Sequence, residues 1–345
     1  MQALTISSHG GLDRIELRAD IPAPELRRAG DVRIRVLAAA LNHLDLFLVA
    51  GLPGVQIVPP WILGADAAGV VDQTGADVHG VAAGDYVVVN PGVSDRTCEY
   101  CRQGEQPLCP RFGILGEHFP GTLAQYVIVP ATNVRTIPSS VPADRAAAFT
   151  LATLTAWRMV VSRARVQAGD NVLIWGIGGG VALAALQICK QIGARVWAVS
   201  GSDEKLRRAA EMGAAELLNR NRDDIGRVVR EATAKRGVDV VIDNVGAAAW
   251  NHSLRALGRR GRLVTCGATS GPFVETDVRR LFWNQWTIMG STMGNDVEFD
   301  AVVGELRAGR LSPPIDGVYP LADGRAAFER MASGEQFGKV VVQIA

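Results

Sequence analysis

The chain has 345 residues, a formal net charge of +1 and 21% charged residues. This near-neutral balance excludes the strongly basic surface that nucleic-acid binding or attachment to an anionic membrane requires. The length suits two domains. The N-terminal residues do not show the basic and then apolar pattern of a secretory signal. Together with the presence of only five cysteines, this predicts a cytoplasmic protein without a disulfide framework.

The first 130 or so residues are predicted to be rich in β-strands. Short apolar runs at 32–38, 68–74, 85–90 and 124–129 are separated by Gly, Pro and Asp. Residues 142–161 follow as an Ala- and Leu-rich segment that predicts helix.

From residue 171 the pattern changes to an alternation of strands and helices. Strands are predicted at 195–199, 238–243, 262–266 and 286–289, and helices at 203–211, 225–234 and 247–257. A helix at 299–308 and a strand at 339–344 end the chain. The alternation predicts a parallel, doubly wound sheet, so the fold class is α/β behind an all-β N-terminal part.

The segment 171–190 carries the motif around which the second half is organised. An apolar run at 172–175 meets a glycine cluster (Gly176, Gly178, Gly179, Gly180), and a helical run begins at Val181. Glycine permits positive φ and lets backbone approach a pyrophosphate at the start of a helix. A membrane span is disfavoured by the glycines and by the lack of flanking basic clusters, and an ordinary glycine-rich loop stays an alternative.

The residue at the end of the next strand is expected to contact the adenosine ribose and so to distinguish NAD(H) from NADP(H). An acidic residue there would favour NAD(H), but the chain has Ser200, Gly201 and Ser202, with Lys205 and Arg207 close behind. Hydroxyl donors and cations suit a 2′-phosphate, so NADP(H) is predicted. Alternatively, the two cations are simply solvated on the helix that follows.

Four candidate metal ligands lie in one short loop, in the spacing Asp-x2-Cys-x2-Cys-x7-Cys: Asp95, Cys98, Cys101 and Cys109. Four anionic ligands suffice for a closed tetrahedral zinc site, which would be structural because no coordination position stays open. The alternative is three incidental reduced thiols.

Together these stretches resemble the medium-chain dehydrogenase/reductase superfamily over essentially the whole chain. The likeness is carried by AAALNHLDLFLVAGLPG, ILGADAAGVV, the cysteine lobe, GILGEHFPGTLAQYVIVP, VLIWGIGGGVALAALQICK and FGKVVVQI. The resemblance implies a GroES-like β domain over 1–132, completed by 297–345, and a Rossmann domain over 133–296. It also implies that the cofactor contacts Thr155, Gly176, Gly179, Gly180, Val181, Ser200, Gly201, Ser202, Lys205, Asn244, Gly267 and Lys339.

The resemblance also indicates what the chain lacks. Zinc alcohol dehydrogenases hold a catalytic zinc with a Cys, the His of a Gly-His-Glu motif and a later Cys. This chain has Asn42, Ala65 and Leu151 at those positions, so no catalytic zinc is predicted. An atypical metal site using Asp66 and His43 is the alternative.

The remaining pattern resembles the zinc-independent quinone-reductase and enoyl-reductase branch, whose Asn-x2-Asp motif matches Asn42 and Asp45. Relatives often continue with Tyr and Arg, where this chain has Phe47 and Val49. The resulting hypothesis is hydride transfer from NADPH to a conjugated carbonyl or a quinone, with Asn42 donating a hydrogen bond to the carbonyl oxygen. His43 is a candidate proton donor, and Asp45 is expected to orient backbone.

Two alternatives stay open for this site. Asn42 could be a structural amide that ties a turn, and the protein could bind NADPH without turnover. The substrate is expected to be a small apolar molecule, with neither nucleic acid nor a membrane as partner. The apolar run 282–289 predicts a homodimer, because an apolar edge strand needs covering.

Overall fold

The computed structural model describes residues 1–345. The chain forms two compact units, the first made of Met1–Ala152 and Gly294–Ala345 and the second of Thr153–Met293. The sequence-based boundary at residue 132 differs from this division. Residues 133–152 belong to the first unit because β10 (Val134–Thr136) pairs with β6 (Tyr86–Val89) and α3 (Ala143–Ala147) packs against its main sheet.

The first unit is built on a sheet with strand order β10-β6-β5-β3-β18-β17, to which β9 adds by pairing with β3. A smaller sheet has the order β2-β1-β4, and β7 pairs with β8. The remaining strands of the unit are β1 (Ala3–Ile6), β2 (Ile15–Arg18), β3 (Asp31–Ala40), β4 (Trp61–Ile62), β5 (Asp66–Thr74), β7 (Gly92–Val93), β8 (Gly113–Ile114), β9 (Tyr126–Pro130), β17 (Ile315–Pro320) and β18 (Lys339–Gln343).

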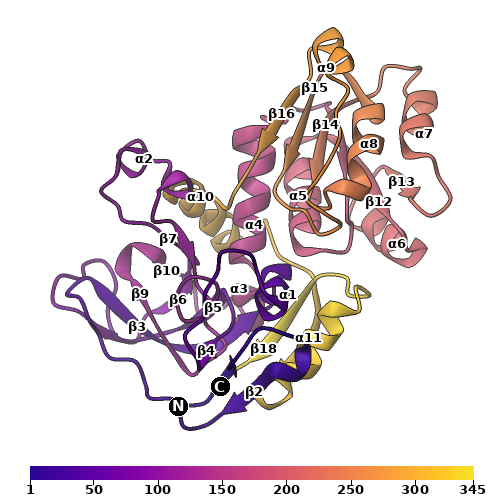
Figure 1. The fold of residues 1–345 in the computed structure, drawn as a ribbon. Coiled ribbons are helices and arrows are strands. Elements are labelled where there is room, and N and C mark those ends of the chain that lie inside the picture. The colour runs from indigo at the N-terminus through magenta and orange to yellow at the C-terminus, as the bar shows by residue number, and fades with distance from the viewer. The chain divides into compact units, whose positions relative to one another are not determined.

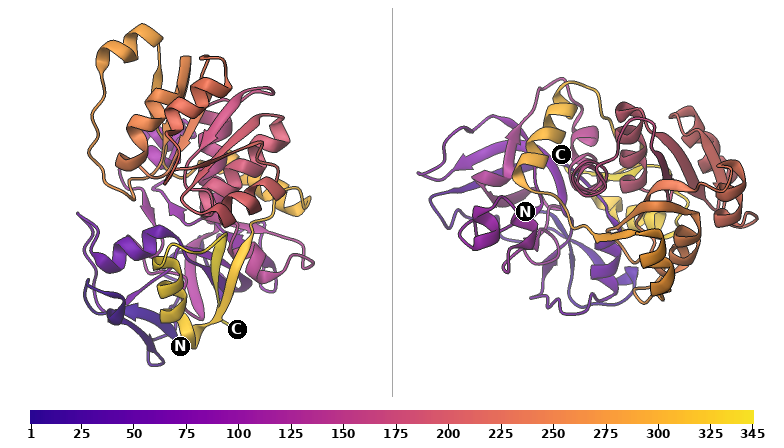
Figure 2. Two further views of the ribbon diagram at one scale, coloured as in Figure 1. Left: turned by 90° about the vertical axis from the view of Figure 1, so that its right-hand side faces the viewer. Right: turned by 90° about the horizontal axis from the view of Figure 1, so that it is seen from above.

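The first unit also contains helices besides α3. They are α1 (His43–Ala50), α2 (Glu99–Arg102), α10 (Asp296–Arg307) and α11 (Gly324–Ala332), with 3₁₀ turns at Leu12–Arg14, Gln106–Leu108, Ala131–Asn133 and Leu321–Asp323. Helix α11 packs on β17 and β18, and Figure 2 shows this C-terminal part of the chain beside the N-terminal strands.

Alternation of side chains explains how the main sheet covers its core. Along β3, Val32, Ile34 and Val36 are fully buried, whereas Arg33 and Arg35 point to the other side. This is the two-residue period of a strand with one face on a core. Valines of β6 and β9, among them Val87, lie in the same cluster.

The second unit confirms the predicted parallel, doubly wound sheet. Its six strands follow the order β13-β12-β11-β14-β15-β16, and every neighbouring pair is parallel. The strands are β11 (Asn171–Ile174), β12 (Arg195–Ser200), β13 (Glu216–Asn219), β14 (Val238–Asp243), β15 (Leu257–Thr265) and β16 (Thr287–Gly290). Helices lie on both faces of this sheet (Figure 1).

The helices of the second unit are α5 (Gly180–Ile192), α6 (Asp203–Glu211), α7 (Ile225–Ala232), α8 (Ala247–Ala256) and α9 (Val278–Asn284). The boundary between the two units falls within helix α4 (Thr150–Trp157). This helix continues as a π-helix over Arg158–Arg163. None of the helices is both long and apolar enough to cross a membrane.

Several elements differ from the sequence-based expectation, among them β17 and α11, which were not predicted. Strand β13 was not predicted, because its four residues form an edge strand in which Leu217 is 40% exposed. Phe282 and Trp283 lie on helix α9 rather than in the last strand. Asp277 caps this helix by accepting the N–H of Arg279 at 3.0 Å, and Gln285 ends it in the left-handed conformation.

Candidate active site

The glycine turn lies at the carboxyl end of β11, in the middle of the parallel sheet. Strand β11 pairs with β12 on one side and β14 on the other, which is the topological switch point where open α/β sheets bind ligands. Gly176 and Gly178 have φ of +72° and +118°, which side chains rarely adopt. Helix α5 begins at Gly180 behind the N-cap Gly179, and no side chain caps its first turn.

The turn therefore fits the pyrophosphate of a dinucleotide. A Cβ on Gly179 would have only the Gly176 carbonyl oxygen nearby, at 3.5 Å, so backbone is open to an approaching ligand. The N–H groups of Gly180 and Val181, both in the first turn of α5, have no side-chain cap to compete with an anion.

The predicted ribose-binding residues come together at the ends of β12 and α6. Ser200 ends β12 and is 7% exposed, and its hydroxyl accepts the N–H of Ser202 at 3.3 Å. Ser202 in turn caps α6 by accepting the N–H of Lys205 at 3.3 Å. The stem of Lys205 crosses the glycine turn, since a Cβ on Gly178 would lie 2.7 Å from its Cδ.

Two of the nearby charged residues, Arg207 and Asp203, are already paired. Arg207 binds Glu204 at 2.6 Å and also pairs with Glu211, so it is occupied on its own helix. Asp203 accepts hydrogen bonds from Asn219 and Arg222, both at 2.8 Å, and these contacts lower the pKa of its carboxyl. Neither charge is therefore free for the ribose.

Arg220 is a candidate ligand that the sequence reasoning missed. It follows β13 directly, and its N–H donates to the Ser200 carbonyl at 2.9 Å, as the parallel pairing of Ser200 with Asn219 dictates. Its Nε lies 3.1 Å from where a Cβ of Gly201 would be. The signal in the sequence was the short run before it, whose assignment as a strand would have placed Arg220 beside Ser200.

Of the residues predicted at the nicotinamide end, Asn244 and Gly267 lie at the carboxyl ends of β14 and β15, next to Gly176 of the glycine turn. A Cβ on Gly176 would lie 2.6 Å from Asn244 Oδ1, and one on Gly267 would lie 2.8 Å from the Asn244 carbonyl oxygen. These three residues therefore adjoin one another. Thr155, on α4, has its hydroxyl 3.8 Å from the sulfur of Met293 instead.

A buried polar cluster forms in the first unit where three strands meet. Strand β3 ends at Ala40, opposite Asp66 on β5 and Val341 on β18. The same antiparallel register continues past the strand, because the Leu41 N–H donates to the Val340 carbonyl at 2.9 Å. This arrangement places Asn42, Asp66 and Lys339 side by side, although they are far apart in the sequence.

Asp66 is the centre of this cluster and is 0% exposed. One carboxylate oxygen accepts the Thr150 hydroxyl at 2.6 Å and the Leu151 N–H at 2.7 Å. The other accepts the amide of Asn42 at 2.9 Å and the ammonium of Lys339 at 3.0 Å. Both oxygens are therefore fully occupied by donors.

Asp45 is a second buried carboxyl beside the cluster, at 2% exposure. It lies in the first turn of α1 and accepts the backbone N–H of Asn42 at 2.7 Å. Burial raises the pKa of Asp45 to about 7, although this hydrogen bond and the Lys339 ammonium oppose the shift. His43, the first residue of α1, is exposed, with its ring centroid 6.4 Å from that of Phe47.

The four candidate metal ligands of the cysteine lobe also come together. Their ligand atoms, from Asp95, Cys98, Cys101 and Cys109, lie within 4.8 Å of one another. The backbone N–H groups of Cys98 and Thr97 donate to one Asp95 oxygen at 2.9 and 2.8 Å and lower the pKa of that carboxyl. This set of three sulfurs and one carboxylate fits a tetrahedral zinc ion.

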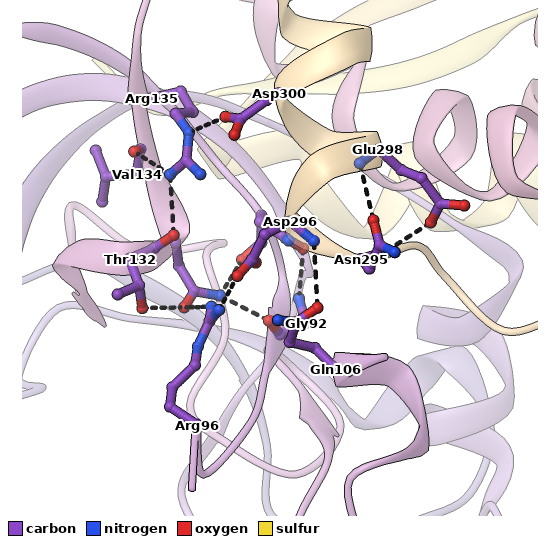
Figure 3. Close-up of polar contacts among 12 residues, drawn as sticks. Gly92, Arg96, Gln106, Thr132, Val134, Arg135, Asn295, Asp296, Glu298 and Asp300 are labelled. Atoms are coloured by element: carbon purple, nitrogen blue, oxygen red, sulfur yellow. Dashed lines mark hydrogen bonds and ion pairs between the residues drawn. The ribbon is translucent and has the colours of Figure 1, made fainter. Parts of the chain in front are cut away.

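The lobe is anchored to the N-terminus of α10 (Figure 3). Arg96, next to the ligand Asp95, forms an ion pair with Asp296 and donates to Asn133 Oδ1 at 3.4 Å. Asn133 donates in turn to the Asn90 and Gly92 carbonyls at 2.8 and 2.7 Å. A second contact joins the Asp296 N–H to Gln106 Oε1 at 3.4 Å.

Comparisons with known proteins show the family to which the chain belongs. The model of the alcohol dehydrogenase GroES-like domain matches residues 28–139, and that of the zinc-binding dehydrogenase matches 180–308. A crystal structure of an NAD-dependent alcohol dehydrogenase is 40% identical, covers 100% of both chains and superposes with a TM-score of 0.95. The chain belongs to the medium-chain dehydrogenase/reductase superfamily.

Relatives within this superfamily differ in activity. The NAD-dependent alcohol dehydrogenase of Saccharolobus solfataricus is 30% identical, over 93% of this chain and 94% of its own length. The quinone oxidoreductase of Lama guanicoe is 27% identical, over 99% and 97%. The acryloyl-coenzyme A reductase of Metallosphaera sedula is 28% identical, over 99% of each chain. The chain is accordingly an oxidoreductase of small molecules with a nicotinamide cofactor.

The positions that resemble the superfamily's catalytic zinc ligands coincide with the buried cluster. Asn42 is a member of it, Ala65 precedes Asp66, and the backbone of Leu151 donates to Asp66. The side chains of Ala65 and Leu151 carry no ligand atom. Apart from the cysteine lobe, no three His, Cys, Asp or Glu residues gather as metal ligands.

Proposed function

We propose that the protein is an NADPH-dependent reductase of quinones or α,β-unsaturated carbonyl compounds that works without a catalytic metal ion. The observation that carries the proposal is the Lys339 ammonium, 3.0 Å from the Asp66 carboxylate and 2.5 Å from Asn42 Oδ1. A fixed positive charge at the one carboxylate of the cluster repels a divalent cation. The atypical site with Asp66 and His43 is disfavoured because both oxygens of Asp66 already accept hydrogen bonds.

A cluster whose only carboxylate is occupied by donors suits conjugated acceptors. When bound, NADPH supplies a hydride to the acceptor, and conjugation spreads the resulting negative charge onto an oxygen as an enolate or a hydroquinone anion. Such acceptors therefore depend less than simple ketones on a metal ion to stabilise the negative charge on oxygen. The relatives named quinone oxidoreductase and acryloyl-coenzyme A reductase support this branch.

Preference for NADPH rests on the residues around Ser200. Arg220 lies beside Gly201 and Lys205 beside Gly178, so two cations lie near the carboxyl end of β12, where Ser200 also carries a hydroxyl. A 2′-phosphate is a dianion that guanidinium and hydroxyl groups bind well. The carboxylate of Asp203, which would favour a ribose hydroxyl, is held by Arg222 and Asn219.

The remaining assignments of the site belong to the same proposal. Thr155, Asn244, Gly267 and Lys339 are assigned as contacts of the nicotinamide half, and His43 as the proton donor to the product. Asp45 is assigned to hold the turn at Asn42, whose N–H it accepts. The exposed rings of Phe47 and Phe119, each 37% exposed, suit an apolar substrate.

Two structural proposals accompany the catalytic one. Zinc bound by the cysteine lobe would cross-link residues 95–109 and would not take part in the reaction. Homodimer formation is favoured by α9, where Val278, Phe282 and Trp283 are between 64% and 72% exposed beside the edge strand β16. Sedimentation as a monomer at micromolar concentration would contradict the dimer.

The proposal is tested by following NADPH oxidation with a quinone, an enone and a simple aldehyde, each with and without a chelator. We expect turnover of the quinone or the enone that the chelator does not change. Turnover confined to the aldehyde, and lost on chelation while the fold persists, would establish instead the alcohol dehydrogenase that the names of other relatives suggest. NADPH binding without any turnover would favour a non-catalytic protein.

A further inference from the structure

We infer that the cysteine lobe holds its zinc ion exchangeably: the ion is released at Asp95, where the Arg111 guanidinium takes its place as the partner of the carboxylate. This inference goes beyond the proposed reduction of quinones or enones and rests only on the proposal that the lobe binds zinc. Its basis is the unequal way in which the structure holds the four ligand side chains.

The sulfur ligands are held in place by backbone donors. Cys109 Sγ accepts the N–H of Asp95 at 3.5 Å and that of Arg111 at 3.3 Å, and Cys98 Sγ accepts the N–H of Cys101 at 3.5 Å. Cys101 and Cys109 are also buried, at 8% and 5% exposure. Because N–H groups compensate part of the charge of a thiolate, the sulfurs are arranged before an ion binds.

Asp95 offers a single oxygen to the ion. Its Oδ1 accepts the N–H groups of Thr97 and Cys98 at 2.8 and 2.9 Å, which fills both lone pairs of that oxygen. Only Oδ2 is left as a ligand atom. Thiolate is the softer donor that zinc favours in closed structural sites, whereas carboxylate oxygen suits harder ions. The bond to Asp95 is therefore the weakest of the four and the first to break.

A cation of the chain lies near the same oxygen. The Arg111 Nε is 4.0 Å from Asp95 Oδ2, and the Arg111 side chain is 81% exposed, so it is free to approach or leave the carboxylate. A zinc ion on Oδ2 and the guanidinium repel each other. Arg111 therefore supplies the positive charge beside Asp95 when the ion has left, and it moves into water when the ion binds.

The second guanidinium beside Asp95 has a different role. Arg96 forms an ion pair with Asp296 and donates to Asn133 Oδ1 at 3.4 Å (Figure 3). Its backbone has a φ of +62°, which costs energy in a residue with a side chain and is kept because these contacts hold it. Arg96 therefore anchors the lobe, and Arg111 competes with the ion.

Exchange at Asp95 makes the occupancy of the lobe follow the available zinc. The steps are ligand substitutions without oxidation or reduction. The bond to Oδ2 breaks, Arg111 approaches the carboxylate, and a donor atom of a competing molecule takes the coordination position that Asp95 has left. The bonds to the three sulfurs break afterwards. Because Arg96 joins the lobe to α10, a change in zinc level would also reach that helix.

Zinc transfer to the chromogenic chelator 4-(2-pyridylazo)resorcinol tests the inference. The zinc-loaded wild type is compared under anaerobic conditions with Asp95→Cys, Arg111→Ala and, as a matched control, Arg102→Ala, which removes an exposed arginine of the same lobe. Asp95→Cys should release zinc at least tenfold more slowly, since changes around a metal ligand shift affinity by about 10 to 100-fold. Arg111→Ala, which keeps the N–H to Cys109, should release zinc about two- to fivefold more slowly, as expected for loss of an exposed charge contact, and Arg102→Ala should match the wild type.

Asp95→Asn is a further variant, which keeps an oxygen acceptor for Thr97 and Cys98 but lacks the anionic ligand. It should release zinc faster than the wild type, by about tenfold or more. Release from the wild type as slow as from Asp95→Cys, or equal rates from Asp95→Asn and the wild type, would overturn the inference. Equal effects of Arg111→Ala and Arg102→Ala would also overturn it. A wild type that binds no zinc would refute the lobe proposal as well, whereas failure to reduce any quinone or enone would refute only the proposed reductase.

Discussion

Lys339 and Asp66 form an ion pair in the interior of the first unit, with side chains 3% and 0% exposed and 3.0 Å between Nζ and Oδ2. Removing one partner of such a pair leaves an uncompensated buried charge. We predict that Lys339→Met alone destabilises the protein by about 3 to 5 kcal/mol and that Lys339→Met/Asp66→Asn recovers most of the loss. Denaturant unfolding of the three proteins measures both effects. Equal stability of the single and double variants would show that the pair is not coupled.

Asp45 predicts a pH dependence of stability. Burial raises its pKa to about 7 in the folded protein, so between the unfolded value near 4 and pH 7 the folded state holds a proton that the unfolded state has lost. Stability therefore falls as pH rises through this window, by about 1.4 kcal/mol per pH unit for this group, and levels off above pH 7.

The matched variant is Asp45→Asn, which has no ionisable group but keeps an oxygen for the Asn42 N–H. The difference in unfolding free energy, variant minus wild type, should grow in favour of the variant from pH 4 to pH 7. A difference that is constant with pH would mean that Asp45 is ionised in the folded protein at low pH as well.

Arg220 predicts the cofactor preference. Arg220→Ala should raise the KM for NADPH by about 10 to 100-fold, because a charge-assisted contact to phosphate is lost, and should leave the KM for NADH nearly unchanged. Arg207→Ala is the control, since Arg207 is engaged by Glu204 and Glu211. If both variants weaken NADPH equally, the effect is one of general charge and not of contact with the phosphate.

The cysteine lobe predicts a link between metal binding and α10. Because Arg96 lies next to the ligand Asp95 and pairs with Asp296, removal of bound zinc should loosen the first turn of that helix. Hydrogen exchange of residues near 296–300 should become faster on chelation, while exchange in α5 should not change. In Asp296→Asn the effect of chelation on α10 should be smaller, and an unaltered response would contradict the link.

Cobalt tests the ligand set itself. The wild type should bind one Co²⁺ per chain with the absorption of a tetrahedral thiolate site, and Cys101→Ser should lose that spectrum. Cys189→Ser is the matched control, because Cys189 is buried in α5, where burial raises the pKa of its thiol to about 12. Loss of the spectrum in the control alone would place the metal elsewhere.

The elements that were predicted correctly are those specified by residues close together in the sequence. Alternating apolar runs and helices specified the parallel sheet, and the cluster from Gly176 to Gly180 marked its ligand-binding turn because positive φ and open backbone require glycine. The spacing of Cys98 and Cys101 was sufficient to predict that their sulfurs lie close together, since ligands three residues apart are near one another in a short loop.

Long-range register explains what the sequence did not predict. The sequence did not predict that Lys339 contacts Asn42, nearly 300 residues earlier in the chain, because this contact depends on the pairing of β18 with β3. Arg220 was missed for a similar reason, because its place beside Ser200 depends on the edge strand β13. Such contacts depend on which strands pair, and single-chain patterns do not specify that choice.

The central claim, reduction without a catalytic metal, is tested most directly by the turnover of Cys101→Ser after dialysis against a chelator. This variant lacks the metal site of the lobe, so any remaining dependence on metal must come from the cluster around Asp66. We predict that NADPH-dependent reduction of a quinone or an enone proceeds at the same rate before and after dialysis and is not increased by added zinc. Loss of turnover on dialysis, with the fold intact by circular dichroism and activity restored by one equivalent of zinc, would contradict the claim.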